Sequence, residues 1–355
     1  MALESISIRN LRNLVEIHLR PQQGINLIVG TNGSGKTSLL EAIYILGRGR
    51  SFRESKSRAV IMKGKPWYEV TGQIRDSGIS TRIGIRRSAR EITVRMNGTS
   101  VRKLSTLAKQ LPIHIITPRS HELLEAGAGV RRRFIEWGVF HVEHGYQRLS
   151  SRYHRALTQR NAALKNQQDI HALWDEEIIE LAGSIDRIRR GYVEELSRYL
   201  EEEMQHLLDG QQVRLEWRRG WDAEQDLGES LDRNRSADLS RGFTHAGPHR
   251  ADLVVRLEGE LSRQWASRGQ QKLIVCGLFL AQTRLIRERT GKRPVILMDD
   301  LAAELDREHR ERMLDRLRVN DSQVFITATD AGIFSNRVSD VMFHVEHGAM
   351  VPDGV

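Results

Sequence analysis

The chain carries, at residues 30–37, the stretch Gly30-Thr31-Asn32-Gly33-Ser34-Gly35-Lys36-Thr37. It matches the phosphate-binding pattern of a glycine, four residues, and then glycine, lysine and a hydroxyl residue. The apolar run before it predicts a buried strand, and residues 38–46 predict the helix that follows. Glycines in this setting let backbone N–H groups and the helix N-terminus face a triphosphate. We expect all eight residues to bind nucleotide, with Lys36 at the β- and γ-phosphates and Thr37 at Mg²⁺.

The composition is that of an ordinary soluble protein: of 355 residues, 39% are hydrophobic and 28% are charged. No apolar run approaches the ~20 residues that span a bilayer, and the first residues do not resemble a signal peptide. The single cysteine, Cys276, can form no internal disulfide, which fits a reducing compartment. We therefore expect a cytoplasmic protein with no membrane partner.

The formal net charge of +9 leaves two interpretations open. The partner could be nucleic acid or another polyanion, or the surface could simply be basic throughout. Charge alone does not decide between them.

The pattern of apolar residues divides the chain into strands and a helical block. Alternation predicts strands at 5–8, 15–19, 68–74, 92–96, 112–116, 213–217 and 252–257. Between Gly129 and Leu208 the period is helical, and a break at 166–169 predicts two long antiparallel helices. Residues 222–240 are polar and weakly patterned, and predict a loop.

The helical block thus interrupts an α/β domain. We expect residues 1–128 to form its N-terminal half, 129–208 a helical arm and 209–355 its C-terminal half. The sequence Phe-His-Val-Glu-His-Gly occurs twice, at 140–145 and 343–348, which is too short for a structural repeat. His141 and His144 could face one metal on a helix, but a structural zinc site needs four ligands and no others cluster with them.

Residues 294–298 form an apolar strand that ends in Asp299 and Asp300. In proteins with a phosphate loop, such a strand lies beside the loop and its first acid holds the Mg²⁺ shell. We assign that role to Asp299 and expect Asp300 to polarise the attacking water. Acids often end strands, so this strand alone is weak evidence for a Mg²⁺ site. Together with the phosphate loop it becomes strong evidence.

Two further stretches resemble motifs of the ABC-type ATPases. Ser267, Gly269 and Gln270 open an apolar helix in the manner of the signature loop, where the serine hydroxyl and the helix N-terminus form a second anion site. Residues 302–306 resemble the D-loop. Each alone could be an ordinary helix start or capped turn. The resemblance implies that Ser267 of one subunit completes the catalytic site around Lys36 and Asp300 of another, with two ATP molecules between head-to-tail subunits.

More specifically, the chain resembles the RecF family of bacterial recombination mediators over nearly its whole length. This family is a branch of the SMC-like ABC ATPases with a short helical arm. The stretches that carry the resemblance are Ile8-Arg9-Asn10-Leu11-Arg12-Asn13, Gly47-Arg48-Gly49-Arg50-Ser51-Phe52-Arg53, Arg131-Arg132-Arg133-Phe134-Ile135 and His245-Ala246-Gly247-Pro248-His249-Arg250-Ala251-Asp252-Leu253.

The resemblance implies an α/β fold, a P-loop ABC-type ATPase head with an inserted, mainly α-helical, short coiled-coil-like arm. It implies a weak DNA-dependent ATPase that dimerises with ATP, binds gapped or junction DNA and helps load recombinase onto single strands with RecR- and RecO-type mediators. Arg12 and Asn13 join the nucleotide-binding residues. The arginines assigned to DNA phosphates, unless they are merely solvated, are Arg48, Arg50, Arg53, Arg131 and Arg132.

Three departures from the family patterns stand out. Arg119 replaces an acid after a proline, Thr327 stands where transporter ATPases have a switch histidine, and Asp300 replaces a glutamate. The shorter acid suggests slow hydrolysis, which suits a timer. The alternatives are a transporter ATPase subunit, which leaves the helical arm unexplained, and an SMC-like structural DNA tether, which the short arm disfavours.

Overall fold

The computed structural model describes residues 1–54, 56–167, 171–300, 305–330, 332 and 340–351. The chain divides into two compact units. Unit 1 comprises residues Met1–Ser120 and Leu278–Val355, and unit 2 comprises His121–Gly277. The boundary falls inside helix α9 (Arg268–Thr290). The mixture of helices and sheets confirms the expected α/β class, and the expected arm segment 129–208 lies in unit 2 together with residues 209–277.

Unit 1 contains a mainly parallel sheet whose strand order is β15-β14-β3-β13-β12-β8. All five residues of β3 (Ile25–Val29) are buried, because strands lie on both of its edges and helices cover this kind of sheet. Only β15 runs antiparallel to its neighbour. The other strands are β8 (Ile113–Ile116), β12 (Val295–Met298), β13 (Val324–Ala328), β14 (Val341–Glu346) and β15 (Ala349–Val351).

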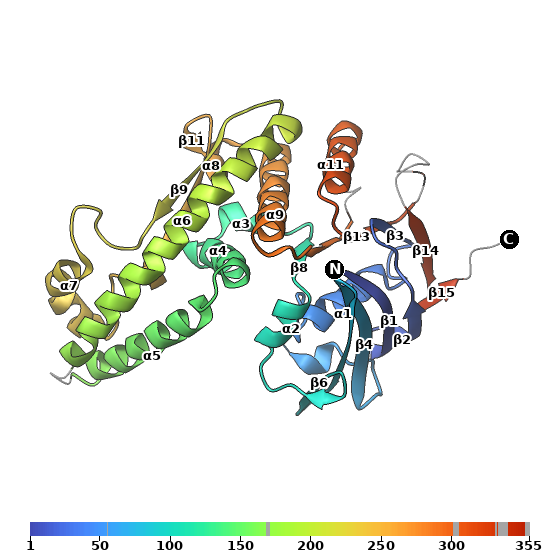
Figure 1. Ribbon diagram of the computed structural model, residues 1–355, viewed down its shortest axis with the longest axis horizontal. Coiled ribbons are helices and arrows are strands. Elements are labelled where there is room, and N and C mark those ends of the chain that lie inside the picture. The colour runs from blue at the N-terminus through green and yellow to red at the C-terminus, as the bar shows by residue number, and fades with distance from the viewer. Residues whose placement is uncertain (55, 168–170, 301–304, 331, 333–339, 352–355) are drawn as a thin grey trace. The chain divides into compact units, whose positions relative to one another are not determined.

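A second, antiparallel sheet of unit 1 has the order β2-β1-β4-β5-β6-β7. Its inner face packs with helix α1 (Lys36–Arg48) in one continuous core, which includes Leu3, Val70, Ile85 and Leu40 (Figure 1). Its strands are β1 (Ala2–Leu11), β2 (Leu14–Leu19), β4 (Trp67–Asp76), β5 (Ile79–Ser88), β6 (Ile92–Met96) and β7 (Thr99–Ser100). Unit 1 also contains helices α2 (Ser105–Gln110) and α11 (Arg307–Val319).

The parallel sheet fixes where the functional side chains meet. Strands β3, β13 and β12 run parallel and adjacent in that order, so their carboxyl ends share one edge. The strand that ends in Asp299 was expected beside the phosphate loop, and Asp299 does contact Thr37 there. Strand β13 lies between β3 and β12 and brings Thr327 to the same edge.

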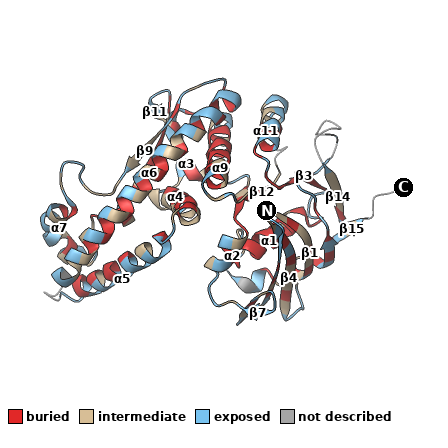
Figure 2. Cartoon of the chain, in the orientation of Figure 1, coloured by how far each residue is buried: buried red, intermediate tan, exposed pale blue. Residues whose placement is uncertain are grey.

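Unit 2 is built mainly from helices. Its long helices α5 (Tyr146–Lys165) and α6 (Asp175–Leu207) are antiparallel, since Arg189 of α6 bonds Tyr146 at the start of α5 and Asp175 pairs with Arg160 near its end. Buried and exposed residues alternate with helical period along α6 (Figure 2). Within the described residues, no helix has the length and apolarity that crossing a membrane requires. The shorter helices are α3 (Glu122–Glu125), α4 (Ala128–Val142), α7 (Leu227–Arg241) and α8 (Ser262–Trp265).

Helix α7 corrects the loop expected at residues 222–240. Asp226 caps the helix by accepting a hydrogen bond from the N–H of Glu229, and the Glu229 side chain bonds back to the N–H of Asp226. This reciprocal cap stabilises the first turn. The apolar period is weak because the helix buries few apolar side chains and also buries Asp238, which pairs with Arg160.

Unit 2 also holds a three-stranded antiparallel sheet of order β11-β10-β9. Strand β10 (Asp252–Leu257) pairs along its whole length with β9 (Val213–Arg218), and at its end with the short β11 (Glu260–Leu261). The strands expected at 213–217 and 252–257 are therefore confirmed.

A buried polar network links the helices of unit 2 to the segment before β10. The Tyr153 hydroxyl lies 2.7 Å from His249 Nδ1, and His249 Nε2 lies 3.0 Å from the Thr244 carbonyl oxygen. Since a carbonyl only accepts, Nε2 carries the hydrogen and the hydroxyl donates to Nδ1. Burial lowers the pKa of His249 from 6.5 to about 4, and the nearby positive charges of Arg250 and Arg132 act in the same direction.

We predict that unit 2 loses stability in acid because of His249. Between pH 6.5 and about 4 the unfolded chain binds more protons at this residue than the folded chain does, so stability rises with pH. The contribution is complete above pH 6.5 and is lost as the pH falls toward 4. Urea unfolding should show a loss on the order of 2 kcal/mol across this window that is smaller in His249→Gln. An equal loss in the variant would contradict this assignment.

Candidate nucleotide site

The loop at residues 30–35 leaves the carboxyl end of β3 and enters α1 at Lys36, as the sequence predicted. Gly33 and Gly35 have φ of 80° and 122°, values that L side chains rarely adopt. At Gly30 the limit is space, because a Cβ there would lie 2.2 Å from the Val345 carbonyl oxygen. The glycines are therefore required by the loop conformation itself.

Lys36 lies back along the loop. Its Nζ donates to the carbonyl oxygens of Gly30, at 2.7 Å, and Thr31, at 2.9 Å. Partial burial lowers the pKa of Lys36 below its usual range, and the nearby charges of Asp300 and Asp299 oppose that shift. The carbonyl oxygens of the phosphate loop thus hold the ammonium group of Lys36 in place.

Thr37 and Asp299 meet at the edge of the sheet although they are 262 residues apart. The Thr37 hydroxyl lies 2.9 Å from one Asp299 carboxylate oxygen and 3.2 Å from the other. Two neighbouring oxygen ligands of an octahedral Mg²⁺, at bonds of about 2.1 Å, lie about 2.9 Å apart. A hydroxyl and a carboxylate at this separation therefore fit a shared Mg²⁺ ion.

Thr327 orients both acids at the end of β12. Its hydroxyl donates to Asp299 Oδ1 at 2.9 Å and accepts from the backbone N–H of Asp300 at 2.8 Å. Asp300 itself has φ of 53°, which is uncommon for a residue other than glycine. The backbone at Asp300 is therefore held by a side chain from the neighbouring strand.

These groups line a cavity of about 220 Å³ in unit 1. Most of the residues that line it carry hydroxyl, amide, ammonium, guanidinium or carboxylate groups. The lining residues are Asn13, Asn32, Gly33, Gly35, Lys36, Thr37, Ser38, Arg53, Asp299, Asp300, Thr327 and Thr329.

Arg53 is among the residues that line this cavity, although the sequence assigned it to DNA. Its backbone N–H bonds the Ser51 hydroxyl, and its guanidinium lies 3.9 Å from Glu41 Oε2. Among the described residues that line this cavity, Arg53 is thus the second cationic side chain, after Lys36.

Arg12 does not line the cavity, in contrast to the expectation that it binds nucleotide. It forms a two-point pair with the buried carboxylate of Glu41, with both N···O distances at 2.8 Å, and donates to the Ala59 carbonyl. The hydrogen bonds to Glu41 raise the pKa of Arg12. Its neighbour Asn13 does reach the loop, donating to the carbonyl oxygens of Gly33 and Ser34.

The C-terminal hairpin of unit 1 supports the loop from the other side. The backbone N–H of Gly348, in the turn between β14 and β15, donates to the Ser34 carbonyl at 2.8 Å. A Cβ at Gly348 would lie 2.1 Å from the Asn13 carbonyl oxygen, so only glycine fits there. The loop is thus held between residues from both ends of the chain.

The signature residues lie in unit 2, outside the residues that line the cavity. The Ser267 hydroxyl accepts from the N–H of Gln270 at 3.2 Å, and the Gln270 side chain accepts from the N–H of Ser267 at 2.9 Å. This is the reciprocal cap of an ordinary helix start. Within the described part of the chain the Ser267 hydroxyl has no hydrogen-bond acceptor, and Ser267 and Gly269 are exposed at the start of α9.

The structure divides the arginines assigned to DNA. Arg131 is 5% exposed and forms a two-point pair with Asp252, and it also donates to the carbonyls of Leu124 and Ala126. This geometry corrects its assignment to DNA. Arg132 donates to the Ala251 carbonyl and is partly buried. Arg50 is exposed, and Arg48 lies 5.8 Å from the centre of the Tyr44 ring.

The remaining expectations have different outcomes. Residues 302–304 of the D-loop lie outside the described residues, and Asp306 caps α11 by accepting from the N–H of His309. Arg119 is exposed and its N–H donates to the Thr117 hydroxyl. Among the described residues, no three or more His, Cys, Asp or Glu side chains cluster so that they could hold a metal ion. His141 lies in α4, and His144 follows the end of that helix.

Sequence reasoning missed the roles of Glu41, Ser38 and Thr327. Glu41 belongs to the helix after the loop, where an acid reads as a surface residue, yet it is fully buried. Ser38 donates to the Asn13 side chain at 3.0 Å. A signal existed only for Thr327, whose position after an apolar strand placed it at the sheet edge.

Comparisons with known proteins agree with this geometry. The family model described as RecF/RecN/SMC N terminal domain matches residues 2–350. The chain is 41% identical to the DNA replication and repair protein RecF of Shewanella denitrificans, over 98% of each chain. It is also 41% identical to the protein of the same name from Thioalkalivibrio sulfidiphilus, over 99% of each.

Solved structures give the same result. One, described as "the recombination mediator protein RecF-ATPrS in RecFOR pathway", superposes with a TM-score of 0.88 at 26% identity, covering 99% of this chain and 98% of that one. An Smc head domain from Pyrococcus furiosus superposes with a TM-score of 0.64 at 18% identity, over 98% and 94% of the two chains, and so shares the fold. On these matches and this site, the chain belongs to the RecF family of the RecF/RecN/SMC group.

Proposed function

We propose that the cavity of unit 1 binds ATP with Mg²⁺. The observation that carries this proposal is the placement of Lys36, Thr37 and Asp299 around one polar cavity, with the Thr37 and Asp299 oxygens 2.9 Å apart. Backbone N–H groups and Lys36 would hold the phosphates, and Thr37 and Asp299 would hold the metal. Mg²⁺ supplies charge neutralisation between the β- and γ-phosphates. The ATP-bound form named for a solved relative supports the choice of nucleotide.

The nucleotide site is completed by a second copy of the chain. The described residues that line the cavity all come from unit 1. The signature residues Ser267, Gly269 and Gln270 are not among them, so this cavity alone offers no signature residue to a γ-phosphate. Ser267 keeps a free hydroxyl hydrogen at the exposed N-terminus of α9, where the partial positive charge of the helix favours an anion. Ser267, Gly269 and Gln270 of one copy would therefore close the site of the other, so that ATP promotes dimerisation.

The dimer acts on DNA in recombinational repair. Support comes from the names of the relatives, which are replication and repair proteins, from the resemblance to recombination mediators and from the net charge of +9. We propose that it binds gapped and junction DNA, works with RecR- and RecO-type mediators in the cytoplasm and helps load recombinase. Arg48, Arg50 and Arg132 remain the candidate contacts to DNA phosphates, and such binding should weaken steeply with salt.

Hydrolysis is slow and serves as a timer. Asp300 lies at the cavity wall with its backbone fixed by Thr327, which suits a residue that orients a water molecule. Its side chain is one methylene shorter than the glutamate of most ABC-type ATPases, so its carboxylate lies farther from the attacking water. We propose that DNA binding stimulates this weak activity.

Arg53 and Arg50 form a matched pair of variants. Because Arg53 lines the cavity and Arg50 is exposed outside it, Arg53→Gln should weaken ATP binding about tenfold and Arg50→Gln should not. Titration of a fluorescent ATP analogue measures both. Equal effects of the two substitutions would contradict a role of Arg53 in ATP binding.

Ser267→Arg tests the composite site. The variant should bind ATP like the wild type but stay monomeric, because the added side chain fills the space of the partner's γ-phosphate. Sedimentation with and without ATP measures this. Lys36→Met should lose both ATP binding and dimerisation, and Lys65→Met, an exposed lysine elsewhere in unit 1, is the control. ATP-dependent dimers of Ser267→Arg would exclude the assignment of the signature.

Asp300→Asn tests the hydrolytic role. The amide cannot accept a proton, so turnover should fall about 100-fold while ATP binding persists. ATP-bound dimers should then hold gapped DNA longer than wild-type dimers, as measured by dissociation from immobilised DNA. Unchanged turnover would remove Asp300 from the reaction.

A further inference from the structure

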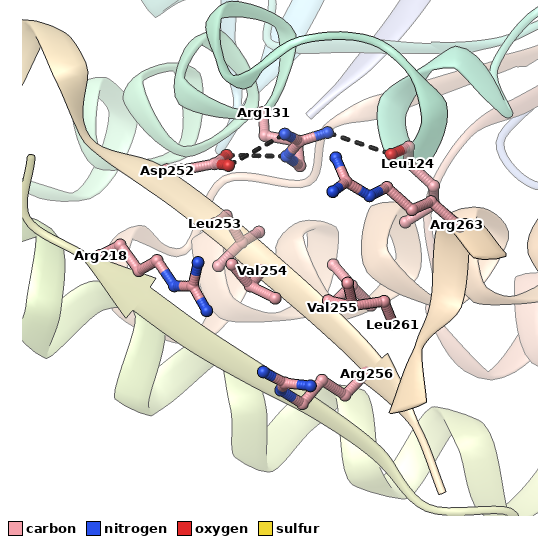
Figure 3. Close-up of a pocket in the computed structure, with 10 residues that line it drawn as sticks. All are labelled: Leu124, Arg131, Arg218, Asp252, Leu253, Val254, Val255, Arg256, Leu261 and Arg263. Atoms are coloured by element: carbon pink, nitrogen blue, oxygen red, sulfur yellow. Dashed lines mark hydrogen bonds and ion pairs between the residues drawn. The ribbon is translucent and has the colours of Figure 1, made fainter. Parts of the chain in front are cut away.

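A second pocket, in unit 2, is lined by four arginines. It has a volume of about 110 Å³ and lies against strand β10 (Figure 3). We call it the arginine pocket, and its charged residues are Arg131, Arg218, Arg256, Arg263 and Asp252. Small-molecule sites usually have roughly 300–1,000 Å³. This pocket is therefore suited to one or two side chains of a larger partner.

The charges around the pocket do not balance. Arg131 is neutralised by its two-point pair with Asp252. Arg218 and Arg256 each donate through Nε to the same carboxylate, that of Glu216, at 2.8 and 3.2 Å.

Arg263 has no carboxylate partner within the part of the chain that the structure describes, and Figure 3 shows its side chain directed toward Arg131. Four guanidinium groups therefore share two carboxylates, and the pocket keeps a positive potential. It attracts an anion.

The arrangement follows from the strand register. Arg218 stands opposite Asp252 and Glu216 opposite Val254, so these side chains share one face of the antiparallel pair β9–β10. Arg263 reaches the pocket from α8, which directly follows β11. Four backbone segments, α4, β9, β10 and α8, supply the arginines, and Figure 3 shows Arg218 and Arg263 reaching the pocket from different sides.

The pocket also has an apolar side. Val254 and Leu261 line it between the arginines. Trp265, two residues beyond Arg263 in the same short helix, is 70% exposed. Exposed tryptophan and arginine together with small apolar pockets are typical of the residues that dominate protein–protein binding energy.

We propose that the arginine pocket docks an acidic segment of a partner protein, with a carboxylate among the arginines and an adjacent apolar side chain against Val254 and Leu261. A nucleic-acid backbone would satisfy the charge but would offer no aliphatic side chain for the apolar wall. All lining residues belong to unit 2, whereas those that line the nucleotide cavity belong to unit 1.

The test uses three fluorescein-labelled peptides and the full chain at about 150 mM salt, where nonspecific attraction is screened. The first has the sequence Asp-Asp-Leu-Asp-Phe, the second replaces each Asp by Asn, and the third replaces Leu and Phe by Ser. Fluorescence anisotropy should show binding of the first peptide, and each of the others should bind about tenfold more weakly or worse.

Two variants locate the binding. Arg263→Glu and Arg218→Glu should each weaken binding of the first peptide about tenfold or more, because each reverses a charge at the pocket. Arg233→Glu is the matched control, since it makes the same charge change at an exposed side chain of α7 in the same unit and should have no effect. ATP binding should be unchanged in all three variants.

Three outcomes would overturn the proposal. The first is no binding of the acidic peptide at about 1 mM. The second is equal binding by wild type and Arg263→Glu. The third is displacement of the peptide by a short DNA duplex whose own affinity falls by the same factor in Arg263→Glu, which would make the pocket a nucleic-acid contact.

Discussion

The hydrogen bond between Thr37 and Asp299 depends on almost everything else in unit 1. Its two residues are 262 positions apart, and they meet only because three parallel strands end at the same edge of one sheet. Any change in strand order would separate them. The antiparallel sheet and the core around α1 hold the first residue, and β12 and β13 hold the second. Both sheets of unit 1 and the core around α1 are therefore needed to bring the Thr37 hydroxyl and the Asp299 carboxylate together.

The sequence predicted the parts of this site that depend on local pattern. Glycines that need positive φ, a lysine that begins a helix and acids that end a strand are all recognisable without a structure. Sequence reasoning did not find contacts made by side chains from distant segments. Arg53 was assigned to DNA and Arg12 to nucleotide, because nothing local reveals that Glu41 is buried between them. The helix α7 was missed since its stability comes from a cap and a buried ion pair instead of an apolar face.

The repeated hexapeptide Phe-His-Val-Glu-His-Gly also shows that local sequence does not by itself determine local structure. At 140–145 it contains the end of α4, and at 343–348 it covers the last four residues of β14 and the turn after it. In the second copy Val345 is fully buried beside the phosphate loop, whereas in the first copy Val142 faces the helical core of unit 2. Identical local sequences thus adopt the structure that their surroundings stabilise. A short motif therefore does not determine local structure, whereas the fold class, which depends on long apolar patterns, could be predicted.

The support that the C-terminal hairpin gives to the phosphate loop has a consequence for biosynthesis. The loop is translated before unit 2, but Gly348, whose N–H holds Ser34, is made only after it. At rates of roughly 5–20 residues per second, the loop waits roughly 15–60 s for its final contact. The acids and Thr327 also arrive late. A nascent chain therefore carries a phosphate loop that lacks this support until unit 2 and the strands that follow it have been made.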